Sequence, residues 1–236
     1  MLIPVYDGEP LRNVRFPLAT WSIIAMNLVS LIAVSTGLFG QLEKLDVALG
    51  VIPAVVFDYA VRSPELSYVP VPLTFVTALF LHAGFWHFAG NMIFLWVFGD
   101  NVEDAMGSRR FVIFYVACGA VAALVHAMMA RDSQSPLIGA SGAVSGVLAA
   151  YLMLFPRVRV YGLIFSWLPI VLPAYIFVGG WIMFQFASAL FGADTQTGWW
   201  AHVGGVIAGG ALIAFFKRPD FLLLGSMAPK GRMPPR

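Results

Sequence analysis

The chain has 236 residues, of which 60% are hydrophobic and only 11% are charged, and its mean hydropathy is +0.84. A soluble domain is about half apolar and about a quarter charged, so this composition excludes a water-soluble globular protein and indicates an integral membrane protein. The net charge of +2 gives no sign of a nucleic-acid partner, and the single cysteine, Cys118, excludes an internal disulfide or a cysteine-based metal cluster.

A helix needs about 20 apolar residues to cross the hydrocarbon core of a bilayer. Six stretches of the sequence are apolar over about this length, and we predict them as spans at residues 17–39, 84–102, 110–130, 138–155, 165–191 and 199–216. The predicted fold class is therefore an all-α membrane protein, with six transmembrane helices in one domain over residues 17–216. Residues 1–16 and 217–236 flank it as an N-terminal segment and a C-terminal tail.

The segment between the first two spans mixes charged and apolar residues. Residues 41–70 suggest short amphipathic pieces at the membrane surface, and residues 71–81 continue them as an interfacial loop before the second span. The N-terminus lacks the basic region and cleavage site of a signal peptide. We therefore expect the first span to act as an uncleaved anchor.

The positions of Lys and Arg predict the orientation of these spans. If the N-terminus is inside, all but three of the 14 basic residues fall in inside segments; the three outside are Lys44, Arg62 and Arg131. Both termini are then cytoplasmic, and we expect the location to be the plasma membrane of a bacterium.

Four polar residues fall at similar depth in this topology, near the outer ends of three spans. His87 and Asn91, four residues apart, share one face of the second span. Ser141 begins the fourth span, and His202 lies near the start of the sixth. Each has an ordinary structural explanation, since a serine often packs or bonds to its own helix and an asparagine can join two helices. Together they favour a site, because polar groups buried in lipid are costly.

Glycines follow two of these residues at helical spacing. Gly142 and Gly146 follow Ser141, and Gly205 and Gly209 follow His202. Small residues four apart let two helix backbones approach closely, so the fourth and sixth spans are expected to pack together. Such packing would bring the serine to the imidazole.

A serine hydroxyl becomes a good nucleophile when a neighbouring imidazole takes its proton. Between Ser133 and Ala193 there is no Asp or Glu that could act as a third member. The pattern thus indicates a Ser141–His202 dyad with no metal or other cofactor. Asn91, His87 and the Ser141 main-chain N–H could stabilise the oxyanion, and the cavity would open to the outer side.

Three motifs, in order along the chain, resemble those of the rhomboid intramembrane serine proteases. They are His82 with His87 and Asn91, then Gly139-Ala140-Ser141-Gly142, then Ala201-His202 with Gly205 and Gly209. The run Asn101-Val102-Glu103, with Gly107 after it, also resembles the turn that follows the second span in this family. Each motif alone is weak, but their order and their places on the predicted spans are specific.

The resemblance implies an intramembrane serine endopeptidase that cleaves single-span membrane proteins in the bilayer, near the outer end of their spans. Ser141 would be the nucleophile and His202 the general base, with His87 and Asn91 in the oxyanion hole. His82, Gly139, Gly142, Gly205 and Gly209 would support the site. The fifth span and the loop at residues 192–198 would act as gate and cap.

Two positions depart from the family pattern. Leu73-Thr74 stands where many relatives have a Trp-Arg pair that anchors the interfacial loop. Ser145 stands four residues after the nucleophile, where some relatives stack an aromatic ring on the catalytic histidine. The resemblance then implies that His202 is oriented in another way.

Three alternatives remain. A rhomboid-like protein that escorts membrane proteins without cutting them would typically lack the serine or the histidine. A zinc protease using His82, His87 and His202 would need a carboxylate at the same depth, and no His-Glu-x-x-His motif is present. A channel or transporter would predict internal symmetry or a charge in the middle of the membrane, and the sequence shows neither.

Overall fold

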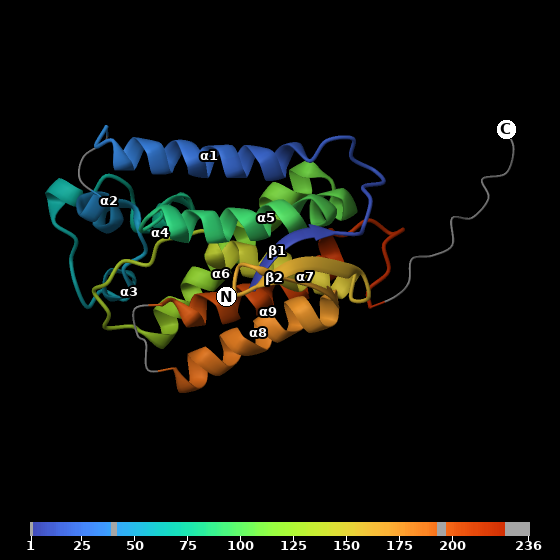
Figure 1. Cartoon of the computed structure of the whole chain (residues 1–236). Coiled ribbons are helices and arrows are strands. Elements are labelled where there is room, and N and C mark those ends of the chain that lie inside the picture. The colour runs from blue at the N-terminus through green and yellow to red at the C-terminus, as the bar shows by residue number, and fades with distance from the viewer. Residues whose placement is uncertain (1, 39–41, 193–196, 225–236) are drawn as a thin grey trace, which may run out of the picture.

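The computed structural model describes residues 2–38, 42–192 and 197–224 of the chain, which are mostly helical. Helices stand at all six predicted spans, and Figure 1 shows the long ones lying side by side. They are α1 (Leu18–Ser35), α5 (Phe85–Met106), α6 (Ser108–Met129), α7 (Ser141–Leu154), α8 (Ala174–Phe191) and α9 (Trp199–Phe216).

Not all of these helices are long enough to span a bilayer alone. By length and composition α1, α6, α8 and α9 qualify, and α5 qualifies together with residues 64–80, from which it is bent by 83°. At 14 residues, α7 is only about 21 Å long. The described residues therefore hold four or five candidate spans, and the count of six stays a prediction, as do the domain limits.

The short helix α7 lies at the centre of the bundle. It packs against α5, α6, α8 and α9, and most of its residues are buried. Because it is surrounded by protein, it has little need of the length that a lipid-facing span requires. Large side chains fill the core at its far end, where Tyr151 meets the rings of Phe98 and Phe155.

A three-stranded antiparallel sheet departs from the predicted all-α fold. Its strands are β1 (Leu2–Asp7), β2 (Arg159–Ile164) and β3 (Leu168–Pro173), in the order β1-β2-β3. In Figure 1 β1 and β2 run beside the helices. The predicted fifth span began at residue 165, but α8 begins at Ala174. Pro169 and Pro173 explain the difference, because proline lacks an N–H and disfavours helix at the residue before it.

Short helices form the segment between α1 and α5, in the region where the sequence predicted an interfacial loop. They are α2 (Leu42–Leu49), α3 (Pro53–Val56), η1 (Pro64–Leu66), α4 (Val71–Thr77) and η2 (Ala78–Phe80). Arg62 holds this segment together, since its buried guanidinium donates to the carbonyls of Ala48 at 2.7 Å and Val69 at 3.4 Å. The loop is thus anchored by an arginine that the sequence motif did not indicate.

Two acidic residues near the end of α5 organise the start of α1. The Glu103 carboxylate, fully buried, accepts hydrogen bonds from the Thr20 N–H and hydroxyl, both at 2.8 Å, and from the Ser108 hydroxyl at 2.6 Å. The Asp104 carboxylate accepts hydrogen bonds from the main-chain N–H groups of residues 12–14. A carboxylate at the first turn of a helix satisfies N–H groups that have no partner within that helix.

Asp7 fastens the sheet to the helices. Its buried carboxylate accepts hydrogen bonds from Asn101 Nδ2 of α5 at 2.7 Å and from the Tyr151 hydroxyl of α7 at 2.5 Å. Burial, opposed by these two hydrogen bonds, raises the pKa of Asp7 from 3.8 to about 6. Since β1 pairs with β2, this contact also holds the β2–β3 hairpin that leads into α8.

This raised pKa predicts a pH-dependent stability. Folding favours the protonated carboxyl, so the contribution of Asp7 is complete below its unfolded-state pKa of 3.8 and is lost as pH rises through about 6. The loss amounts to about 3 kcal/mol. We expect the free energy of unfolding in detergent to fall more between about pH 4 and about pH 7 in the wild type than in Asp7→Asn.

The control is Asp220→Asn, which changes an exposed carboxylate and should keep the pH slope of the wild type. Equal slopes for the wild type and Asp7→Asn would contradict the prediction.

Candidate functional site

The position of Ser141 is set by the extended segment that precedes it. Residues Val51 and Leu137 exchange main-chain hydrogen bonds, at 3.1 and 2.8 Å, and the Gly139 N–H donates to the Ala78 carbonyl at 2.9 Å. At Gly139 the backbone turns with φ +120°, and α7 begins at Ser141. Ser141 is therefore the first residue of a helix, where main-chain N–H groups lack partners within the helix.

Close packing of α7 on α9 brings Ser141 toward His202. A Cβ atom on Gly205 would collide with the Gly142 carbonyl oxygen, and one on Gly209 would collide with the Gly146 carbonyl oxygen. Backbone therefore touches backbone along the two glycine pairs, and the predicted packing of these helices is confirmed. His202 lies in the first turn of α9, and Ser141 in the first turn of α7.

His87 and Asn91 reach the same place from the start of α5. The Ala83 N–H donates to His87 Nδ1 at 3.4 Å, which leaves the proton of the neutral ring on Nε2. Asn91 Nδ2 donates one hydrogen to the His87 carbonyl at 2.9 Å and keeps a second one. A Cβ on Gly139 would lie 2.7 Å from the His87 ring, so a glycine is needed here.

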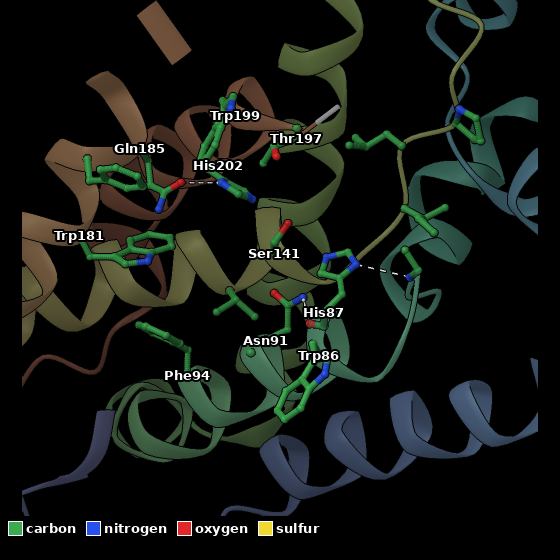
Figure 2. A pocket seen from close by; sticks show the side chains of 18 of the residues that line it. Trp86, His87, Asn91, Phe94, Ser141, Trp181, Gln185, Thr197, Trp199 and His202 are labelled. Atoms are coloured by element: carbon green, nitrogen blue, oxygen red, sulfur yellow. Dashed lines mark hydrogen bonds between the residues drawn. The ribbon is translucent and has the colours of Figure 1, made fainter. Parts of the chain in front are cut away.

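One cavity of about 630 Å³ contains all four of these side chains. Figure 2 shows Ser141 between the imidazole of His202 on one side and His87 with Asn91 on the other. The cavity is bordered by aromatic rings from α5 and α8, among them Phe94 and Trp181, whose centroids are 5.7 Å apart. The structure thus brings together the four residues that the sequence selected for a site; their chemical roles stay predictions.

The surroundings of His202 include residues that the sequence analysis missed. Its Nδ1 lies 2.7 Å from Gln185 Oε1 of α8, and the rings of Trp181 and Trp199 lie 6.2 and 5.8 Å from its own. Ser145, which replaces the aromatic residue of some relatives, donates to the Ser141 carbonyl at 2.6 Å. The imidazole is therefore held by two tryptophans and an amide. The one sequence feature that could have indicated Gln185 is that it is the lone glutamine in an apolar helix.

Another predicted supporting residue, His82, does not line the cavity itself but contacts a residue that does. His82 is buried, and its ring meets that of His87 at a centroid distance of 5.1 Å.

Among the described residues, no cluster of three or more His, Cys, Asp or Glu side chains could hold a metal ion. Of the predicted cap at residues 192–198, positions 193–196 lie outside the described residues.

Comparison with known proteins gives the family. The family model named Rhomboid domain matches residues 71–219. Rhomboid protein 1, mitochondrial, from Saccharomyces cerevisiae is 30% identical over 154 residues, which cover 61% of this chain and 42% of that protein. Presenilin-associated rhomboid-like protein, mitochondrial, from Homo sapiens is 29% identical over 161 residues, covering 64% of this chain and 39% of that protein.

A bacterial relative is similar over a shorter stretch. Rhomboid protease GluP from Bacillus subtilis is 39% identical over 77 residues, 33% of this chain and 15% of that protein. This chain thus spans less than half the length of these relatives. Two of the three are mitochondrial by name, so the comparisons do not support the bacterial plasma membrane that we predicted. The family model and the apolar helices make this an integral, multi-pass membrane protein. The chain belongs to the rhomboid family.

Proposed function

We propose that this protein is an intramembrane serine endopeptidase, with Ser141 as the nucleophile and His202 as the general base. The observation that carries the proposal is that Ser141, His202, His87 and Asn91 line one cavity, although they come from three helices. A nucleophile, a base and two hydrogen-bond donors are the groups that acyl transfer requires. Ser141 stands at a helix N-terminus, where main-chain N–H groups add further donors.

In the first step the Ser141 hydroxyl oxygen attacks the carbonyl carbon of the scissile peptide, and its proton passes to His202 Nε2. The carbonyl oxygen becomes an oxyanion. It would accept hydrogen bonds from His87 Nε2, the second Asn91 N–H and the Ser141 main-chain N–H, because these three residues line one cavity. Because these donors are held in place by α5 and α7, they need little reorganisation as the charge develops.

In the second step His202 gives this proton to the leaving amine, and the carbon–nitrogen bond breaks. A water molecule then attacks the acyl-enzyme ester while His202 accepts its proton. His202 passes this proton to Ser141 Oγ as the carbon–Oγ bond breaks, which releases the carboxylic acid product and restores Ser141. The partner of His202 Nδ1 is the neutral amide of Gln185, whereas a triad would have a carboxylate at this nitrogen. The chemistry is therefore that of a dyad.

The substrate is a segment of another membrane protein. The cavity border between α5 and α8 consists of aromatic side chains, including Trp86 and Phe184, which are 81% and 60% exposed. Apolar rings at this place suit contact with a transmembrane segment arriving from the lipid. We propose that it passes between α5 and α8 and unwinds at a small residue to reach Ser141. The cavity would face the outer side, with both termini cytoplasmic.

Labelling with a fluorophosphonate probe tests the nucleophile, because the probe bonds covalently to an activated serine. We expect the protein, purified in detergent, to be labelled as wild type and to lose labelling in Ser141→Ala and in His202→Ala. A chelator should have no effect. Gel fluorescence measures the result.

Ser145→Ala is the control, since it removes a buried hydroxyl one turn along the same helix and should leave labelling in place. Labelling that survives Ser141→Ala would rule out this nucleophile. A wild type that neither labels nor cleaves a membrane substrate would favour the escort alternative.

Removal of Asn91 tests the oxyanion hole. We expect Asn91→Ala to lower kcat for a single-span substrate about 100-fold and to leave KM nearly unchanged, because the donor acts on charge that exists only in the transition state. Initial rates over a range of substrate concentrations measure both constants.

The chain offers a matched control in Asn27, whose Nδ2 donates to the Ile23 carbonyl at 2.9 Å, the same four-residue hydrogen bond in α1. Asn27→Ala should keep the wild-type kcat. An equal loss of kcat in both variants would mean that Asn91 has a structural role only.

A further inference from the structure

Gln185 combines features that packing alone does not explain. It lies in α8, is only 4% exposed, and is the one polar residue among the four buried residues of that helix. A buried amide in a membrane helix is costly unless its hydrogen bonds are made. Its Oε1 atom meets His202 Nδ1 at 2.7 Å, and Figure 2 shows the two side chains pointing toward each other across the cavity wall.

We propose that Gln185 is a positioning residue that fixes the tautomer and orientation of His202. This inference rests on the proposed function of the dyad. An amide oxygen only accepts hydrogen bonds, so its partner nitrogen must carry a proton. The proton of the neutral imidazole is then on Nδ1, and Nε2 is bare. Only that tautomer can take the Ser141 proton at Nε2.

The surroundings of the ring show why a positioning residue is needed. Trp181 is tilted by 35° to the His202 ring and Trp199 by 89°, so both restrict the ring by shape alone. Neither tryptophan can distinguish Nδ1 from Nε2 through these ring contacts. The hydrogen bond to Gln185 is made at Nδ1 itself, so it distinguishes the two ring nitrogens and favours the tautomer with the proton on Nδ1.

The hydrogen bond also links the base to the position of α8. This helix is the least buried of the four helices that qualify as spans on their own, with 22% of its residues buried inside the protein. Trp181, one turn before Gln185, contacts Phe94 of α5 at the cavity border. A movement of α8 away from α5 that admits a substrate would also separate Gln185 from His202. Full activity of the base then requires α8 to return.

The test uses the full chain purified in detergent, with a fluorogenic single-span membrane substrate. In Gln185→Leu we expect kcat to fall about tenfold, the worth of one hydrogen bond, and KM to stay within about twofold. Gln185→Glu, which restores an acceptor for the Nδ1 proton, should recover most of the lost kcat. Met183→Leu, on the exposed side of the same helix, should match the wild type.

A second readout does not depend on activity. In protein labelled with ¹⁵N-histidine and carrying Ser141→Ala, the NMR signals of His202, assigned by their loss in His202→Ala, report which ring nitrogen is protonated. We expect the proton on Nδ1 with Gln185 present, and a mixture of tautomers when Gln185→Leu is added.

The two readouts separate the two proposals. An active wild type whose kcat is unchanged in Gln185→Leu would overturn the role of Gln185, as would a proton on Nε2 with Gln185 intact. An inactive wild type with the expected NMR result would overturn the proposed protease and keep Gln185 as the residue that sets the tautomer of His202.

Discussion

The candidate site depends on one contact, the packing of the α7 backbone directly on the α9 backbone. At the pairs Gly142–Gly205 and Gly146–Gly209 there is no room for even a methyl group. Interhelical packing of this kind is a main source of stability in lipid, where burial of apolar surface contributes little. The same contact sets the separation of the two helix starts, and so of Ser141 and His202. Stability and chemistry therefore share one geometric constraint.

The remaining elements arrange partners around that contact. The start of α5 contributes His87 and Asn91, and the loop before α7 is held by main-chain hydrogen bonds to the segment between α1 and α5. On the other side α8 contributes Gln185 and Trp181, and it contacts the rest of the bundle less than α6 or α9 does. The sheet connects the start of α8 to the N-terminal segment, because β1 pairs with β2 and Asp7 bonds to the helices. The structure thus combines a closely packed pair of helices with a third that is less buried.

The sequence predicted most of the site and part of the fold, for physical reasons. Ser141, His202, His87 and Asn91 could be found because polar residues stand out in apolar helices and because topology places them at one depth. The pairing of β1 with β2 could not be predicted, because it joins residues that are more than 150 positions apart, such as Leu2 and Ile164. In addition, short apolar stretches of this kind are compatible with both helix and strand. Gln185 was missed because it belongs to none of the sequence motifs and has no polar neighbour along its own helix that would indicate a site. Arg62 was missed because it anchors the loop from a position outside the family motif.

Adding one methyl group at the contact between α7 and α9 tests most directly whether this contact holds Ser141 and His202 in place. In Gly205→Ala the new Cβ meets the Gly142 carbonyl, whereas in Gly210→Ala it would lie 3.6 Å from the Met153 sulfur, an ordinary contact. Each variant is reconstituted into liposomes with a single-span substrate, and the cleavage products are measured by mass spectrometry. We expect Gly205→Ala to lose most of the cleavage and Gly210→Ala to cleave like the wild type. Cleavage by Gly205→Ala at the wild-type rate would show that the site does not depend on this contact.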